Sequence, residues 1–182
     1  MMSEMQLLGD LIGAGINVLD RMKSRQEERR RQRLELLQRI AEKRISKLEA
    51  KIEQVMSSPE DVDLFTSVIE ALIKDDETAN VPYYAAILER QLEGTSHRER
   101  LRRLVVAFKA LSAKELGLLA VHDPKRVLPG HDDDWISVGL PARLAYSGLY
   151  NSSTGVVHGS RFTAIGQLAI ETAKSAQQAV EL

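Results

Sequence analysis

The sequence predicts a mostly α-helical protein with a long N-terminal helix, a helical bundle and a C-terminal winged helix that carries a small β-hairpin wing. Aromatic residues make up only 4% of the 182 residues, a composition that favours helices over a β-sandwich or barrel. Apolar residues recur at helical spacing through most of the chain. Near its end, short apolar stretches flank a turn-rich segment, which indicates a hairpin.

Residues 1–57 are predicted to form one helical arm of coiled-coil type, which Pro59 ends because proline cannot continue a helix. In its second half the apolar residues recur at steps of three and four, which give an eleven-residue repeat and a nearly straight or slightly right-handed coil. Such a stripe must be buried, either against a second copy or along the rest of the chain. We expect a homo-oligomer, and the predicted interface comprises Leu34, Leu37, Ala41, Ile45, Leu48, Ile52 and Met56.

The arm also holds a basic segment. Residues 21–51 contain twelve Lys or Arg against five Asp or Glu, although the net charge of the whole chain is −1. One interpretation of its first part, residues 21–33, is a solvated linker helix with Glu–Arg pairs. The other is contact with nucleic-acid phosphates or an anionic membrane surface. The apolar, glycine-containing stretch from Leu7 to Met22 would support close helix packing or, less favoured, attachment to such a membrane surface.

Residues 58–111 are predicted to form the helical bundle. Ser58 is a good N-cap, and Pro59 suits the first turn of the helix that follows. A second helix opens at Val81 and ends at Gly94, and a third extends from His97 to about Leu111. The short connections between them are typical of bundles.

Residues 112–182 are predicted to form the winged-helix domain. Ser112 and Glu115 have the spacing of a capping box, so a helix should begin there. A further helix from about Trp135 to Tyr146 should end at Gly148. Two short strands are then expected on either side of the turn at 151–155, before a last helix that begins near Phe162.

No set of residues has the pattern of a catalytic, cofactor or metal site, and we expect no enzyme activity. His131 and the three aspartates after it are contiguous, whereas hard cations draw oxygens from alternating loop positions. An acidic loop that caps the next helix is the favoured interpretation. The chain has no cysteine, which fits a reducing compartment, and its longest apolar run is too short to span a membrane. A cytoplasmic protein is therefore expected.

DNA binding is the alternative function, because winged helices can contact DNA through basic residues. Residues 112–182 hold six basic and seven acidic residues, so the positive surface that a DNA reader needs is missing from this part of the sequence. Protein–protein interaction is therefore the leading interpretation. The candidate nucleic-acid contacts are Arg29, Arg30, Arg31, Arg33, Arg98, Arg102, Arg143 and Arg161.

Three stretches carry a family likeness: Val81 to Leu88, Leu111 to Leu116, and Phe162 to Gly166 after the predicted hairpin. Together they resemble bacterial abortive-infection proteins of the Abi-alpha type, over the C-terminal two thirds of the chain. The resemblance implies a cytosolic role in defence against phage and no catalytic residues. We therefore expect a non-enzymatic interaction or adaptor module with a protein partner that the sequence does not identify.

Overall fold

The computed structural model describes residues 25–45, 58–75, 77–94, 98–122, 140–150 and 162–180. These residues are mostly α-helical, which confirms the predicted class. The helices are α2 (Arg25–Ile45), α4 (Pro59–Lys74), the short 3-10 helix η2 (Thr78–Asn80), α5 (Val81–Glu93), α6 (Arg98–Lys109), α7 (Ala113–Val121), α9 (Leu140–Tyr146) and α10 (Ala164–Val180).

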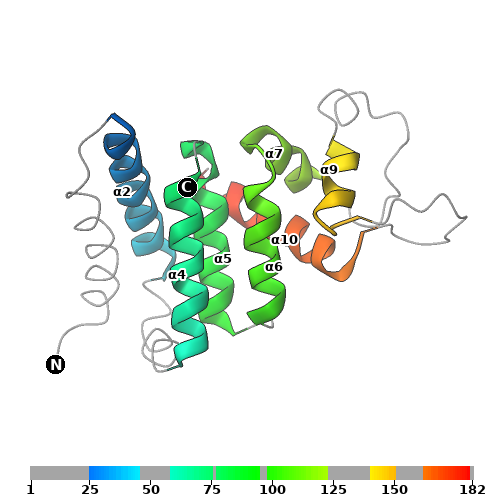
Figure 1. Cartoon of the computed structure of the whole chain (residues 1–182), viewed down its shortest axis with the longest axis horizontal. Helices are drawn as coiled ribbons and strands as arrows, with labels where there is room; N and C mark the ends of the chain where they lie inside the picture. The colour runs from blue at the N-terminus through cyan, green and yellow to red at the C-terminus, as the bar shows by residue number, and fades with distance from the viewer. Residues whose placement is uncertain are drawn as a thin grey trace, which may run out of the picture.

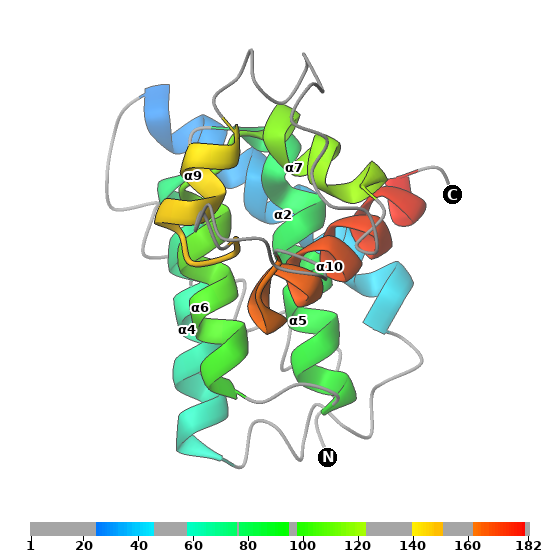
Figure 2. The ribbon, with the colours of Figure 1, turned by 90° about the vertical axis from the view of Figure 1, so that its right-hand side faces the viewer.

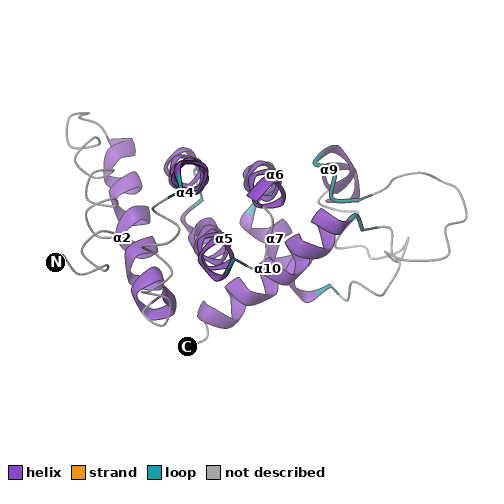
Figure 3. Ribbon diagram, turned by 90° about the horizontal axis from the view of Figure 1, so that it is seen from below, coloured by secondary structure: helices purple, strands orange, loops and turns teal. Residues whose placement is uncertain are grey.

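Helix α5 lies at the centre of the molecule. It packs against α2, α4, α6 and α10, and nine of its thirteen residues are buried, on all sides of the helix. A helix that is apolar nearly all round is stable only when other helices cover it. Viewed from below, α4, α6 and α9 form one row and α5 and α10 lie in a second row (Figure 3). Helices α2 and α9 lie at opposite ends of the molecule (Figure 1).

The helix boundaries in the bundle follow the local signals in the sequence. Helix α4 has Ser58 as its N-cap and Pro59 in its first turn, as expected. Helix α5 ends at Gly94, whose φ of 66° is a left-handed conformation that glycine adopts without strain. Helix α7 begins at the predicted capping box of Ser112 and Glu115. These three predictions are confirmed.

One hydrophobic core joins the three regions that the sequence analysis separates at 57/58 and 111/112. The same cluster of buried side chains contains Leu37 of α2, Ile87 of α5 and Ile170 of α10. Helix α10 packs on both α5 and α7, and Figure 2 shows α7, α9 and α10 in front of the rest of the bundle. The predicted bundle and the C-terminal region therefore do not form separate cores.

The structure corrects the role of two residues in the predicted oligomer interface. Leu34 and Leu37 each have 0% of their surface exposed within a single chain, because α2 packs on α5 and α4. Their apolar stripe is covered by the same chain, so the prediction that a second copy covers these two residues is wrong. Ala41 and Ile45 lie in the last part of α2. The remaining positions, Leu48, Ile52 and Met56, lie outside the described residues.

The C-terminal region agrees in part with the predicted winged helix. Helix α9 is described from Leu140 and ends before Gly148, which has a φ of 73°. Leu149 and Gly148 donate backbone hydrogen bonds to the last turn of α9, which closes it as a Schellman motif. The described residues contain an isolated antiparallel bridge between Tyr150 and Phe162, and no longer strand. The predicted turn at 151–155 lies outside them.

Candidate functional site

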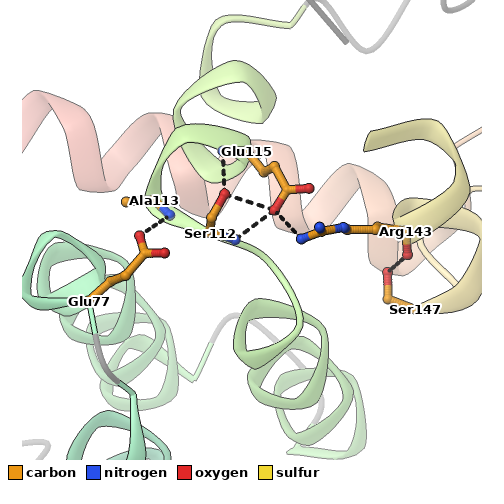
Figure 4. Close-up of polar contacts among 6 residues, drawn as sticks. All are labelled: Glu77, Ser112, Ala113, Glu115, Arg143 and Ser147. Carbon is orange, nitrogen blue, oxygen red and sulfur yellow. Dashed lines mark hydrogen bonds and ion pairs between the residues drawn. The ribbon is translucent and has the colours of Figure 1, made fainter. Parts of the chain in front are cut away.

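The best-defined polar site joins the start of α7 to α9, and its centre is the carboxylate of Glu115 (Figure 4). Glu115 Oε2 accepts hydrogen bonds from the backbone nitrogen of Ser112 at 2.7 Å and from its hydroxyl at 2.8 Å. Arg143 of α9 donates to the same oxygen from Nη1 at 3.1 Å. The Glu115 side chain is only 2% exposed, whereas that of Arg143 is 55% exposed. A buried carboxylate thus ties α9 to the start of α7.

A second group of polar contacts joins the segment after α4 to the same helix start. Glu77 Oε2 accepts a hydrogen bond from the backbone nitrogen of Ala113 at 2.7 Å (Figure 4). The carboxylate of Asp75 accepts from the backbone of Glu77, from the amide of Asn80 and from the hydroxyl of Tyr84, at 2.8–2.9 Å. Burial, followed by the nearby Asp75 charge, raises the pKa of Tyr84. Tyr84 therefore remains a neutral donor to Asp75 at ordinary pH.

These contacts border a cavity of about 320 Å³, which we call the junction cavity. It lies at the C-terminal ends of α4 and α6, beside the start of α7 and the exposed side of α9. Its lining combines acidic, basic and neutral polar groups with short apolar ones. The lining residues are Lys74, Asp75, Glu77, Asn80, Lys109, Ala110, Leu111, Ser112 and Arg143.

Two of the predicted nucleic-acid contacts hold α6 against α4. Arg98 donates to both oxygens of Asp61 at 2.6 Å, and Arg102 donates to the backbone oxygen of Glu60 at 3.4 Å. Hydrogen bonding to the Arg98 guanidinium lowers the pKa of Asp61, although burial of that carboxylate opposes the shift. The hydrogen bond to Asp61 likewise raises the pKa of Arg98. The two-pronged pair is typical of arginine and carboxylate.

The arginines of α2 occupy three different environments. Arg33 is only 3% exposed, and its Nη2 donates to the backbone oxygen of Ile73 at the end of α4 at 3.0 Å. The prediction that Arg33 faces nucleic acid is therefore wrong, because its guanidinium is buried between two helices. Arg31 is exposed and pairs with glutamates on its own helix. Arg29 is exposed and Arg30 is half-buried.

The predicted site residues do not form one surface. Arg143 borders the junction cavity, and Arg98 and Arg102 join α4 to α6. Arg33, on α2, is buried between α2 and α4. Arg161 lies outside the described residues. Most of the described candidates therefore hold helices of the same chain together.

The close packing at the start of α10 was not predicted from the sequence. Thr163 caps this helix: its hydroxyl accepts from the backbone nitrogen of Gly166 at 3.0 Å and donates to the backbone oxygen of Gly148 at 2.8 Å. A Cβ atom at Gly166 would lie 2.0 Å from the backbone oxygen of Leu149. The stretch from Phe162 to Gly166, which the sequence predicts to begin the last helix, makes this contact between helix and bridge. A glycine three residues after a capping threonine was the available signal.

The described residues contain no group of three or more His, Cys, Asp or Glu side chains arranged to hold a metal ion. In the same part of the chain, no helix combines the length and the apolar character needed to cross a lipid bilayer. The predicted membrane-surface segment, Leu7 to Met22, lies outside these residues.

Comparison with known proteins gives no match: no family model, no curated protein and no solved structure is significantly similar to this chain. The resemblance to abortive-infection proteins therefore stays a prediction based on the three stretches quoted above.

Proposed function

We propose that this chain is a non-enzymatic interaction module that binds itself and a protein partner. The observation that supports this proposal best is the use of the candidate arginines. The guanidinium groups of Arg33, Arg98 and Arg143 are each bonded to a carbonyl or carboxylate of the same chain. Groups that hold helices together are less available for phosphates, so the basic residues favour a scaffold over a DNA reader.

The proposed self-association uses the apolar stripe beyond Leu37. The stripe continues through Ile45 and Leu48 in the sequence, whereas its first two leucines are covered by α4 and α5. Sedimentation equilibrium of the full chain should give a discrete oligomer. Ile45→Glu together with Leu48→Glu should yield a folded monomer, whereas Gln32→Glu, on the exposed side of α2, should not change the mass. A monomer at every concentration of the unmodified chain would contradict the proposal.

The proposed C-terminal architecture is a winged helix in which residues 151–161 form the wing. The support is the order of α7, α9, the antiparallel pair of Tyr150 and Phe162, and α10. An antiparallel pair that flanks a short segment is what a hairpin produces. Backbone nuclear Overhauser contacts between residues 149–152 and 160–163, in the register that the Tyr150–Phe162 pair sets, would establish the two-stranded wing, and their absence would rule it out.

The proposed cellular role is defence against phage, and it depends on the resemblance to abortive-infection proteins. Expression of the chain in a phage-sensitive bacterium should reduce the number of plaques that the phage forms. The Ile45→Glu and Leu48→Glu variant should lose this protection if assembly is required for it. Equal plaque numbers with and without the chain would contradict this part of the proposal.

DNA binding is the second candidate, because exposed arginines remain on two helices. Arg29 on α2 and Arg100 and Arg103 on α6 are exposed. A DNA reader would show affinity that falls steeply with salt and that is lost when Arg143 and Arg161 are replaced. Binding to anionic vesicles that requires residues 1–33 would instead support attachment to a membrane surface.

A further inference from the structure

We propose that the junction cavity binds a small ligand that carries a phosphate group. The inference goes beyond the interaction module proposed above and does not depend on it. Three cationic side chains from three different helices line this one cavity: Lys74 at the end of α4, Lys109 at the end of α6 and Arg143 on α9. Its volume of about 320 Å³ is near the lower end of small-molecule sites.

Several hydrogen-bond donors of the cavity remain available to a ligand, beside a few acceptors such as the buried Oδ1 of Asn80. The carboxylate of Asp75 already accepts three hydrogen bonds, and that of Glu77 accepts one from Ala113. The side chain of Lys109, by contrast, has no ion pair or hydrogen bond with the described part of the chain. Lys74 pairs with Glu70 at 3.4 Å, but this ion pair is exposed, so it contributes little and can be exchanged for a ligand. Arg143 uses one of its five N–H groups on Glu115. A ligand rich in acceptor oxygens would match the donors of Lys74, Lys109 and Arg143.

The number of cationic side chains and their origin on three different helices favour phosphate over carboxylate. A carboxylate offers two oxygens in one plane, which suits a single arginine. A phosphate offers three oxygens around a tetrahedron and can meet Lys74, Lys109 and Arg143 from three sides. Because the three cations come from three helices, a bound phosphate would also link the ends of α4 and α6 to α9.

The acidic groups of the cavity set the expected strength of binding. Asp75 and Glu77 line the cavity and Glu115 neutralises part of the charge of Arg143. Long-range attraction of an anion is therefore small, and a phosphate would gain its affinity from direct, charge-assisted hydrogen bonds to the three cationic side chains. Binding should be weak for inorganic phosphate, stronger for a phosphate monoester whose remaining atoms contact the cavity wall, and sensitive to salt.

Isothermal titration of the full chain tests the proposal. Inorganic phosphate, at a pH where it carries two charges, should bind saturably above a sodium chloride background of matched ionic strength. Lys74→Gln and Lys109→Gln should each weaken binding about tenfold, the loss expected for one charge-assisted hydrogen bond. Lys114→Gln makes the same charge change on an exposed lysine of α7 outside the cavity and should leave affinity unchanged. These three positions are exposed, so circular dichroism should show folded variants.

Three further probes identify the source of the phosphate. A nucleoside monophosphate should bind more tightly than inorganic phosphate, and the same nucleoside without phosphate should not bind. Affinity that grows with the length of a single-stranded oligonucleotide would overturn the assignment of a small ligand. No saturable phosphate binding, or equal binding by the Lys74→Gln and Lys109→Gln double variant, would overturn the site itself. Self-association is measured in a separate experiment, so a failure to bind phosphate would not contradict the proposed interaction module.

Discussion

Gly166 allows the start of α10 to touch the chain that leaves α9. A Cβ atom there would meet the backbone oxygen of Leu149 at 2.0 Å and the ring of Phe162 at 2.9 Å. Neither atom belongs to a flexible side-chain end, so Gly166→Ala should destabilise the fold by about 3 kcal/mol, at the upper end of overpacking effects. Urea unfolding measures the difference.

Gly117 offers a matched control for the same substitution. It lies inside α7, and a Cβ atom would have its nearest neighbour at an ordinary distance of 3.6 Å. Gly117→Ala should therefore stabilise the protein by about 0.5–1 kcal/mol, because alanine loses less backbone entropy in a helix. If the two substitutions had similar effects, the close contact at Gly166 would be wrong.

Arg33 is the clearest case of a surface-type residue in a core position. Arg33→Ala removes its hydrogen bond to the Ile73 carbonyl and the packing of its buried stem, so it should cost about 2 kcal/mol. Arg29→Ala, one turn earlier on the exposed face of α2, should change stability by less than about 0.5 kcal/mol. Chemical denaturation of both variants checks the contrast, and a costly Arg29→Ala would contradict it.

Among single residues, helix caps were easier to predict from the sequence than contacts between distant residues. Ser112 and Glu115 were identified because a capping box is a local pattern of four residues. The environment of Arg33 could not be predicted, because its partner Ile73 is 40 residues away in sequence. The residues around Arg33 also have the composition of a solvated helix, so the sequence does not distinguish the buried arginine from its exposed neighbours.

Among the helix-to-helix contacts, the Asp61–Arg98 pair predicts how stability depends on pH. The pKa of Asp61 is lowered in the folded state, so the pair stabilises the fold above the ordinary pKa of an aspartate. This contribution is lost as the pH falls through the lowered pKa. Asp61→Asn should cost about 1–2 kcal/mol at neutral pH, since half of the Arg98 side chain is exposed.

The same substitution should cost less in acid, where the wild-type carboxylate is itself protonated. Urea unfolding at neutral and acidic pH gives the two differences. Asp63→Asn, on the exposed face of α4, should have little effect at either pH. A cost for Asp61→Asn that is independent of pH would show that the ion pair does not stabilise the contact between α4 and α6.

The Arg143–Glu115 contact tests whether α9 is attached through charge. Arg143→Gln leaves the buried Glu115 carboxylate with only the Ser112 donors and should cost about 1–2 kcal/mol. Arg103→Gln breaks an exposed pair with Glu99 on its own helix and should cost less than about 0.5 kcal/mol. A double-mutant cycle with Glu115→Gln should show coupling of more than about 0.5 kcal/mol, and simple additivity would contradict the contact.

Helices were predictable as elements because each carries its own start and stop signals. In the sequence Pro59 marks a helix start and Gly94 a helix end, and in the structure α4 begins at Pro59 and α5 ends at Gly94. What covers each helix was less predictable. The stripe that includes Leu34 and Leu37 correctly indicated burial, but an apolar period does not say whether the covering surface belongs to the same chain.

For the molecule as a whole, the continuous core has consequences for folding and assembly. Side chains from α2 through α10 pack in one cluster around α5, so the described helices should unfold together in one cooperative transition. Helix α2, the described part of the arm, is then part of the fold and not an independent rod. The position of the junction cavity could not be predicted, because its lining comes from segments far apart in the sequence that meet only when this core forms.

The burial of α2 against its own chain is the central claim, and the stability of Leu37→Ala tests it most directly. Leu37 has no exposed surface in the single chain, so truncation should lower the free energy of unfolding by about 2–5 kcal/mol. Urea unfolding at several protein concentrations should give the same loss each time, because the contact lies within one chain. A variant that keeps the stability of the wild-type monomer and only dissociates into smaller species would contradict the claim.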